Sequence, residues 1–185
     1  MSFSIHRTRS KNGTLCGFVI LSLILFSCKK SDVIDTNNSG SNNNNNNNSG
    51  DVVYNVNKAT LLQLVNDVRT KGCTCGTTVM PAVGVLAWND QLGKAGYDHS
   101  VDMNTNDYFS HTGLNGSTAG QRITAAGYNW NSYGENIANG YTTEQAVING
   151  WLGSEGHCKN IMNAGYKDMG VGRDGNYWTQ EFGSK

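Results

Sequence analysis

The chain has 185 residues, of which 37% are hydrophobic and 15% are charged, a length and composition that suit one folded domain. Its 14 basic and 14 acidic side chains balance, and the sequence has no long cationic run. Because nucleic-acid binding requires a basic face, this composition argues against nucleic acid as a partner.

The first 27 residues have the pattern of an export signal. Three basic residues precede an apolar run over residues 15–26, which has the length of a signal-peptide core and is too short to span a bilayer comfortably. The Leu-Phe-Ser sequence before Cys28 resembles the lipobox of bacterial lipoproteins, in which the cysteine is lipidated and becomes the mature N-terminus. We therefore predict a lipoprotein signal peptide over residues 1–27 and lipidation at Cys28. The alternative is an ordinary secretory signal.

Residues 28–51 are rich in asparagine, serine and glycine and include seven consecutive asparagines. Such a segment cannot bury enough apolar surface to offset the entropy lost on ordering, so we predict a flexible tether. The folded domain is expected over residues 52–185. These features together predict a cell-envelope protein that a lipid anchor holds at the periplasmic or the surface face of a membrane.

Three cysteines remain in the predicted domain, and export would allow them to form a disulfide. The odd number predicts one bridge to Cys158, from Cys75 or alternatively from Cys73, with the remaining thiol buried, free or used between chains. A zinc site made of Cys73, Cys75 and the nearby His157 is the other interpretation of this cluster.

Apolar residues at helical spacing predict two helices in the first half of the domain. The first runs between Asn57 as its N-cap and Gly72 as its stop, and the second opens at Asn89 or Asp90. The second helix carries His99 on its apolar stripe. We interpret His99 as a hydrogen-bonded core residue and keep it as a reserve candidate for the site.

Three shorter helices are predicted next in chain order. Residues 121–126 form one, residues 142–145 make a capping box for a helix that ends near Leu152, and Ser154 caps a third that runs through Met162. Arg122 in the first of these helices could reach a carboxylate, but we favour a solvated position on the helix surface.

Near the end of the chain, the hydrophobic pattern changes to an alternation with a period of two residues. Strands over 169–173 and 176–182 flank an Asp174-Gly175 turn, which predicts a β-hairpin. Because helices dominate early and strands follow in smaller number, the domain is predicted to be α+β. The last strand should place Trp178, Gln180 and Phe182 on one face and Tyr177, Thr179 and Glu181 on the other.

His111, Glu135 and His157 lie in a glycine-rich region that is otherwise poor in charge. Two imidazoles and a carboxylate can serve acid–base chemistry or hold a divalent metal such as zinc. Their spacing forms no local metal motif, so the fold must bring them together. The alternative is a structural role, in which Glu135 fixes its own loop and His157 caps a helix.

Seven ordered motifs resemble the bacterial branch of the CAP family, also called the SCP or pathogenesis-related-1 family: LAWNDQLGKAGYDHSVDM, YFSHTG, QRITAAGY, YGENIANGY, GWLGSEGHCKNIM, DMGVG and YWTQEFG. The resemblance covers nearly all of residues 52–183. It implies an α-β-α sandwich, with a small antiparallel sheet between helices and a concave site beside the sheet.

Carried over residue by residue, the family's site histidine is His111 and its glutamate is Glu135. The chain departs from plant and animal members at Ser154, where they have glutamate, and at Tyr177, where they have histidine. His157 belongs to a bacterial pattern that would supply the missing imidazole. The resemblance thus implies a cleft formed by His111, Glu135 and His157, in which His111 and His157 could hold zinc.

Three functions follow from these observations. We favour an exported, non-catalytic module that binds a small-molecule, lipid or cell-envelope ligand. One alternative is a metal-assisted hydrolase that acts on cell-envelope material, with Glu135 as its base. The other is a structural or adhesive surface protein.

Overall fold

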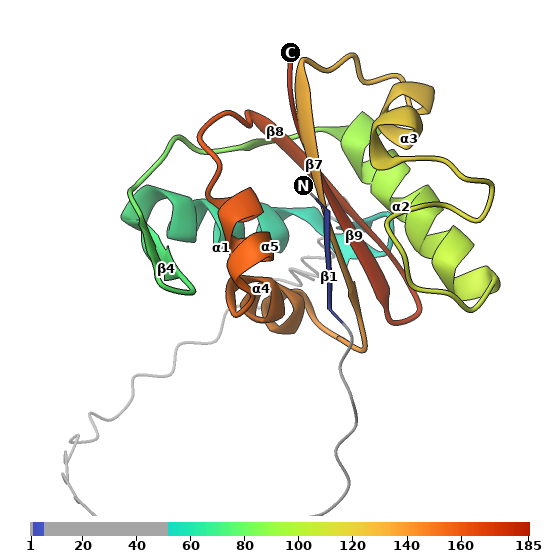
Figure 1. Ribbon diagram of the computed structural model, residues 1–185, viewed down its shortest axis with the longest axis horizontal. Coiled ribbons are helices and arrows are strands. Elements are labelled where there is room, and N and C mark those ends of the chain that lie inside the picture. The colour runs from blue at the N-terminus through green and yellow to red at the C-terminus, as the bar shows by residue number, and fades with distance from the viewer. Residues whose placement is uncertain (1, 6–51) are drawn as a thin grey trace, which may run out of the picture. The chain divides into compact units, whose positions relative to one another are not determined.

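The computed structural model describes residues 2–5 and 52–185 (Figure 1). Apart from residues 2–5, the predicted leader and tether lie outside the described residues, and so does Cys28. These assignments therefore stay predictions. Within the described ranges, no helix is both long enough and apolar enough to cross a bilayer.

A five-stranded sheet forms the middle of the domain, with strand order β1-β7-β9-β8-β6. Strand β9 pairs antiparallel with β7 on one side and with β8 on the other, whereas β1 and β6 add short parallel edges. The predicted small antiparallel sheet is therefore confirmed at its centre. The strand bounds are Ser2–Ile5 for β1, Ala87–Trp88 for β6, Ser132–Asn139 for β7, Asp168–Asp174 for β8 and Tyr177–Ser184 for β9.

Helices cover both faces of this sheet, which gives the expected layered α+β arrangement (Figure 1). The helices α2 and α3 lie on one face, and α1, α4 and α5 lie on the other. The helix bounds are Lys58–Lys71 for α1, Asp90–Thr105 for α2, Ala119–Ala125 for α3, Glu144–Leu152 for α4 and Glu155–Ile161 for α5.

The predicted helix starts are confirmed where a side chain caps the first turn. The Asn57 side chain accepts from the backbone N–H of Thr60 at the start of α1, and Asn89 caps α2 in the same way. Helix α3 begins two residues earlier than predicted, because Thr118 and Gln121 form a capping box. Ser154 occupies the N-cap position of α5 but makes no side-chain capping bond.

The β8–β9 hairpin is present, but its turn lies one residue later than predicted. Asp174 pairs with Tyr177, so the two turn residues are Gly175 and Asn176. Gly175 has a φ of 54°, which glycine adopts without the steric cost that a Cβ would add. The expected turn at Asp174-Gly175 was therefore wrong by one position.

The two faces of β9 pack as the alternation predicted. Trp178 and Phe182 are buried in the main core, together with Leu61 of α1 and Trp151 of α4. Thr179 faces the other way, where its hydroxyl accepts from Ser100 Oγ of α2 at 3.0 Å. The residues that line the α2 face of the sheet therefore belong to a separate, more polar layer.

Helix α2 lies directly on β8 because both elements carry glycine at their contact. A Cβ added at Gly170 would collide with the backbone of Gly93, and one added at Gly172 would collide with Tyr97. No side chain separates the two elements at these points. Their relative position is consequently fixed by backbone contact.

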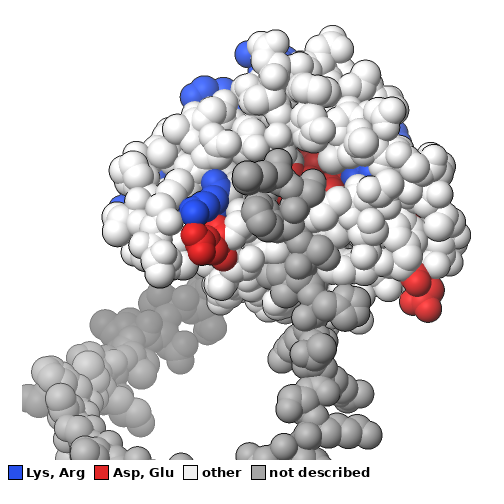
Figure 2. All heavy atoms as spheres, in the orientation of Figure 1, with Lys and Arg blue, Asp and Glu red and all other residues white. Residues whose placement is uncertain are grey.

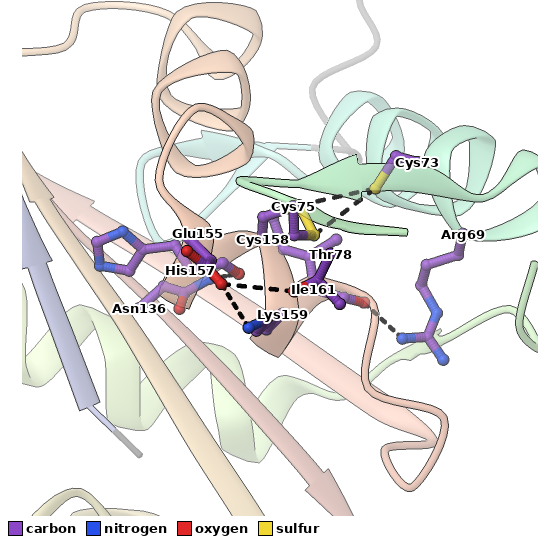
Figure 3. Close-up of a disulfide and its surroundings, with 10 residues drawn as sticks. All are labelled: Arg69, Cys73, Cys75, Thr78, Asn136, Glu155, His157, Cys158, Lys159 and Ile161. Atoms are coloured by element: carbon purple, nitrogen blue, oxygen red, sulfur yellow. Dashed lines mark hydrogen bonds and ion pairs between the residues drawn. A yellow bond between two sulfur atoms is a disulfide. The ribbon is translucent and has the colours of Figure 1, made fainter. Parts of the chain in front are cut away.

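Two small hairpins complete the described fold. One joins β2 (Val52–Val53) to β3 (Val56–Asn57), and the other joins β4 (Cys73–Cys75) to β5 (Thr78–Met80). The second is bound to α5 by a disulfide between Cys75 and Cys158 (Figure 3). The predicted Cys75–Cys158 bridge is thus confirmed, and among the cysteines that the structure describes Cys73 is the free one.

Candidate functional site

The centre of the candidate site is the carboxylate of Glu135 on β7, which is fully buried. His111 Nδ1 lies 2.6 Å from its Oε1 atom, and Arg122 Nη2 lies 2.5 Å from its Oε2 atom. Because a carboxylate can only accept hydrogen bonds, His111 carries its proton on Nδ1. Both oxygens of Glu135 are therefore engaged by donors from outside the sheet.

Arg122 links three parts of the chain at this point. Besides Glu135, its guanidinium donates to the carbonyl oxygens of Ser117 at 2.9 Å and His111 at 3.0 Å. Its side chain is 11% exposed. The favoured expectation of a solvated Arg122 was wrong, and the carboxylate contact that the sequence also allowed is present, because a buried ionised acid requires a charged partner.

The electrostatic environment keeps Glu135 ionised. Burial by itself raises the pKa of this carboxyl group, but the hydrogen bond from His111 and the charge of Arg122 outweigh burial and lower the pKa below its ordinary value. An ionised Glu135 can in turn hold the Arg122 guanidinium in place.

A second acid, Glu181 on β9, is the direct cross-strand partner of Glu135 and is also fully buried. Burial and the negative charge of Glu135 raise its pKa well above the ordinary value. Glu181 is therefore held in its protonated form beside an ionised neighbour. Sequence reasoning placed Glu181 on the correct face of its strand but missed it as a site residue, because strand β7 was not predicted.

His99 lies on α2 behind these carboxyl groups. It is fully buried, and its Nε2 atom lies 2.9 Å from the carbonyl oxygen of Ser110, which confirms the predicted hydrogen-bonded core histidine. Burial lowers its pKa, and the nearby charge of Glu135 offsets this only in part. His99 thus fixes the segment that leads into His111.

His157 does not join the cluster around Glu135, contrary to the sequence-based expectation of a common cleft. It lies on α5 and is 1% exposed. Its carbonyl oxygen accepts from Asn136 Nδ2 at 3.3 Å, and Asn136 projects from the face of β7 opposite to Glu135 (Figure 3). The spacing of His111, Glu135 and His157 along the chain does not indicate which face of the sheet each residue lies on. Glu155, whose direction the sequence left open, is exposed and bonded to Lys159.

The residues around Glu135 do not fit a zinc ion. Both carboxylate oxygens already have partners, and Arg122 supplies the positive charge that a metal would bring. The second imidazole, that of His157, belongs to an element on the other face of the sheet. In residues 2–5 and 52–185, the group of three potential ligands that lies close together is Cys73, Cys75 and Cys158, of which two are joined as a disulfide.

A surface depression lies against this cluster. It has a volume of about 510 Å³, and all but one of its lining residues are polar or charged. His111 and Arg122 are 19% and 11% exposed and are the members of the Glu135 cluster that solvent reaches. The lining residues are Asp98, His99, Asp102, Leu114, Asn115, Ser117 and Arg122.

The loop over this depression is bound to α2 through Asp102. The carboxylate of Asp102 accepts from the hydroxyl of Tyr108 and from the backbone N–H of Leu114 at 3.2 Å. Most of the face in Figure 2 is uncharged, and its few acidic and basic side chains adjoin in some places and stand alone in others. The depression is bordered by charged groups of both signs, Asp98, Asp102 and Arg122.

The fold agrees with the comparisons with known proteins. The chain belongs to the CAP family, because the model of the "Cysteine-rich secretory protein family" matches residues 62–182. The structure of an extracellular protein containing an SCP domain, from Bacillus anthracis, superposes with a TM-score of 0.62 at 33% identity, and the match covers 69% of this chain and 40% of that protein. An outer surface protein from Borrelia burgdorferi has a TM-score of 0.58 at 23% identity, with 69% and 91% covered, and supports the fold alone.

Two Bacillus subtilis proteins are similar in sequence. The uncharacterized membrane protein YlbC is 32% identical over 130 residues, which are 70% of this chain and 35% of that protein. The uncharacterized protein YkwD is 35% identical over 99 residues, which are 52% of this chain and 38% of that protein. The chain therefore spans little more than a third of the length of these curated relatives.

Proposed function

We propose that this protein is a non-catalytic ligand-binding CAP module that works outside the cytoplasm. The observation that carries the proposal is the position of Arg122, which is held by buried Glu135 while it lines a polar depression of about 510 Å³. A charged group that is fixed before the ligand arrives loses little entropy on binding.

The charged side chains in the lining favour a ligand with charged groups over an acyl chain alone. Asp98 and Asp102 stand on α2, and Arg122 stands across the depression on α3. A ligand that carries both an amino and a carboxylate group would match these charges, as the peptide-bearing fragments of a bacterial cell wall do. Cell-envelope material is therefore the ligand class that we propose.

The cellular location is supported by the predicted leader and by the similarity to the Bacillus anthracis protein, which is extracellular. In this proposal Cys28 becomes the first residue and carries the lipid anchor, so that processing removes β1 and leaves a sheet of β7, β9, β8 and β6. Residues 28–51 would then act as a tether that separates the domain from the membrane. Mass spectrometry of the protein from a membrane fraction would detect the lipid on Cys28. An unmodified Cys28 in that fraction would contradict the anchor.

Binding is tested by calorimetric titration of the protein with soluble muropeptides. We expect saturable binding, weakened about tenfold or more in Arg122→Lys, because lysine keeps the charge but cannot reproduce the guanidinium geometry. Asp98→Asn should also weaken binding, whereas Asp67→Asn on α1 is the matched control. The absence of saturable heat, or equal affinity in all four proteins, would overturn the proposal. Thermal melts must show that each variant is folded.

The carboxyl pair of Glu135 and Glu181 is the observation that favours the hydrolase alternative. Two acids whose pKa values are pushed in opposite directions are a common acid–base arrangement. Both side chains are fully buried, however, and both oxygens of Glu135 are occupied. Release of products from peptidoglycan by the native protein, abolished in Glu135→Gln, would establish hydrolysis in place of simple binding.

A further inference from the structure

Three sulfur atoms are in contact where the β4–β5 hairpin meets α5 (Figure 3). Cys75 and Cys158 form the disulfide, and Cys73 Sγ lies 3.6 Å from Cys158 Sγ and 3.8 Å from Cys75 Sγ. Cys75 and Cys158 are buried, whereas Cys73 is partly exposed. A free thiol therefore touches both atoms of a buried disulfide.

We propose that these three cysteines form a thiol–disulfide exchange centre, an activity that is independent of the proposed ligand binding. The Cys73 thiolate attacks Cys158 Sγ, and a Cys73–Cys158 bond forms as the Cys75–Cys158 bond breaks. Cys75 leaves as a thiolate and takes up the proton that Cys73 released. The number of thiols and disulfides is unchanged, so the step needs neither an oxidant nor a reductant.

Strand geometry explains why Cys158 is the sulfur that is attacked. Cys73 and Cys75 are alternate residues of β4, so both side chains lie on one face of the strand. Their Cα atoms are separated by two strand residues, about 6.6 Å, which is near the upper limit for a disulfide. Cys158 comes from a different element and contacts both. The two cysteines of β4 therefore compete for one partner.

Exchange requires a small movement of the hairpin. Cys73 Sγ is almost equally far from both bonded sulfurs, so it lies beside the disulfide and must move toward its axis before attack. The β4–β5 pair has three residue pairs and is not part of the five-stranded sheet. A depression of about 230 Å³ adjoins this hairpin, and Cys73 and Cys158 help to line it. The movement therefore leaves the sheet undisturbed.

The two disulfide isomers differ in the exposure of their free thiol. Before exchange the thiol is on partly exposed Cys73, and after exchange it is on Cys75, which is fully buried. Burial raises the pKa of the Cys73 thiol, and the thiolate is the attacking species. Exchange should therefore be slow at neutral pH and become about tenfold faster for each unit by which the pH is raised, until the pH reaches the thiol pKa.

The test uses the full oxidised chain, diluted and incubated for equal times at pH 6 and pH 9. After an acid quench, the protein is unfolded and labelled with a maleimide, and each cysteine is mapped by mass spectrometry. Cys73 and Cys75 share one tryptic peptide, so fragment ions must assign the label. Among Cys73, Cys75 and Cys158, we expect label on Cys73 alone after pH 6 and a growing share on Cys75 after pH 9. Label that stays on Cys73 and never reaches Cys75 at either pH would overturn the proposal.

Variants give an independent measurement. Cys75→Ser should form the Cys73–Cys158 bridge under the oxidation that closes the native one, and a non-reducing peptide map would show it. The Cys73→Ser, Cys75→Ser double variant cannot form this bridge and should melt at a lower temperature. Cys73→Ser is the control, because it keeps the native bridge and should leave Cys75 and Cys158 unlabelled. Free thiols at both Cys73 and Cys158 in Cys75→Ser would also overturn the proposal.

Discussion

Glu135 and Glu181 are direct partners across β7 and β9, both fully buried, yet their pKa values shift in opposite directions. The difference arises because His111 and Arg122 bond to Glu135, while Glu181 faces the resulting negative charge. One strand pair thus holds a carboxylate and a carboxylic acid side by side.

The raised pKa of Glu181 predicts how stability depends on pH. The ordinary glutamate pKa is 4.5, and the folded value is higher, so between the two the folded state binds more protons than the unfolded state. The contribution of Glu181 to the free energy of unfolding should therefore fall as the pH rises through this window, whereas the lowered pKa of buried His99 makes an opposite contribution up to its ordinary value of 6.5. Glu181→Gln should abolish that fall, because the amide does not titrate. Urea unfolding from pH 5 to pH 8 measures the effect, and a fall of equal size in both proteins would contradict it.

Arg122→Met should destabilise the domain strongly. It would leave the buried Glu135 carboxylate without its charged partner, which costs about 3–5 kcal/mol in comparable cases. Adding Glu135→Gln should recover part of this loss, because the neutral amide is cheaper to bury unpaired. A double-mutant cycle from urea unfolding measures the coupling. Strictly additive effects would mean that the two side chains do not stabilise each other.

Gly170→Ala should destabilise the domain by about 1–3 kcal/mol or more, because its Cβ would collide with the backbone of α2 at Gly93. Gly84→Ala is the matched control, since a Cβ there meets nothing within 4 Å and the φ is not left-handed. Its stability should change by less than about 0.5 kcal/mol. Equal melting temperatures for the two variants would disprove the close packing of α2 on β8.

Zinc should not bind at His111 in the oxidised protein. Arg122 neutralises Glu135, and the sequence-predicted second ligand, His157, lies on the element across β7. Calorimetric titration of chelator-treated protein with zinc is therefore expected to give the same result for the native chain and for His111→Ala. Stoichiometric uptake that disappears in His111→Ala would show that the cluster rearranges to hold a metal.

The sequence predicted elements whose signals are local. Helix caps such as Asn57 and Asn89 lie next to the turns they close, and the alternation in β9 requires only its own residues. Strand β7 lacked such a signal, because five successive residues from Gly134 to Ala138 are buried, and the polar Asn136 among them bonds to Gln180 on β9 and to Asn160 on α5. A strand buried on both faces has no alternating pattern.

The sequence likewise predicted only part of the candidate site. His111 and Glu135 were paired by resemblance, and their contact is present. His157 was assigned to the same cleft because a linear motif does not state which face of a sheet an element covers. Arg122 was missed because its partner is distant in sequence and comes from the strand that was not predicted.

The glycine contact between α2 and β8 gives the depression one rigid wall and one adjustable wall. Helix α2, with Asp98 and Asp102, cannot slide on the sheet without backbone collision. Helix α3 and the loop before it are held instead by side-chain hydrogen bonds, which Arg122 donates to the carbonyl oxygens of Ser117 and His111. Any adjustment on ligand entry is therefore expected in this loop, around the Arg122 guanidinium that Glu135 holds, while the spacing of the two aspartates stays constant and limits the size of the ligand.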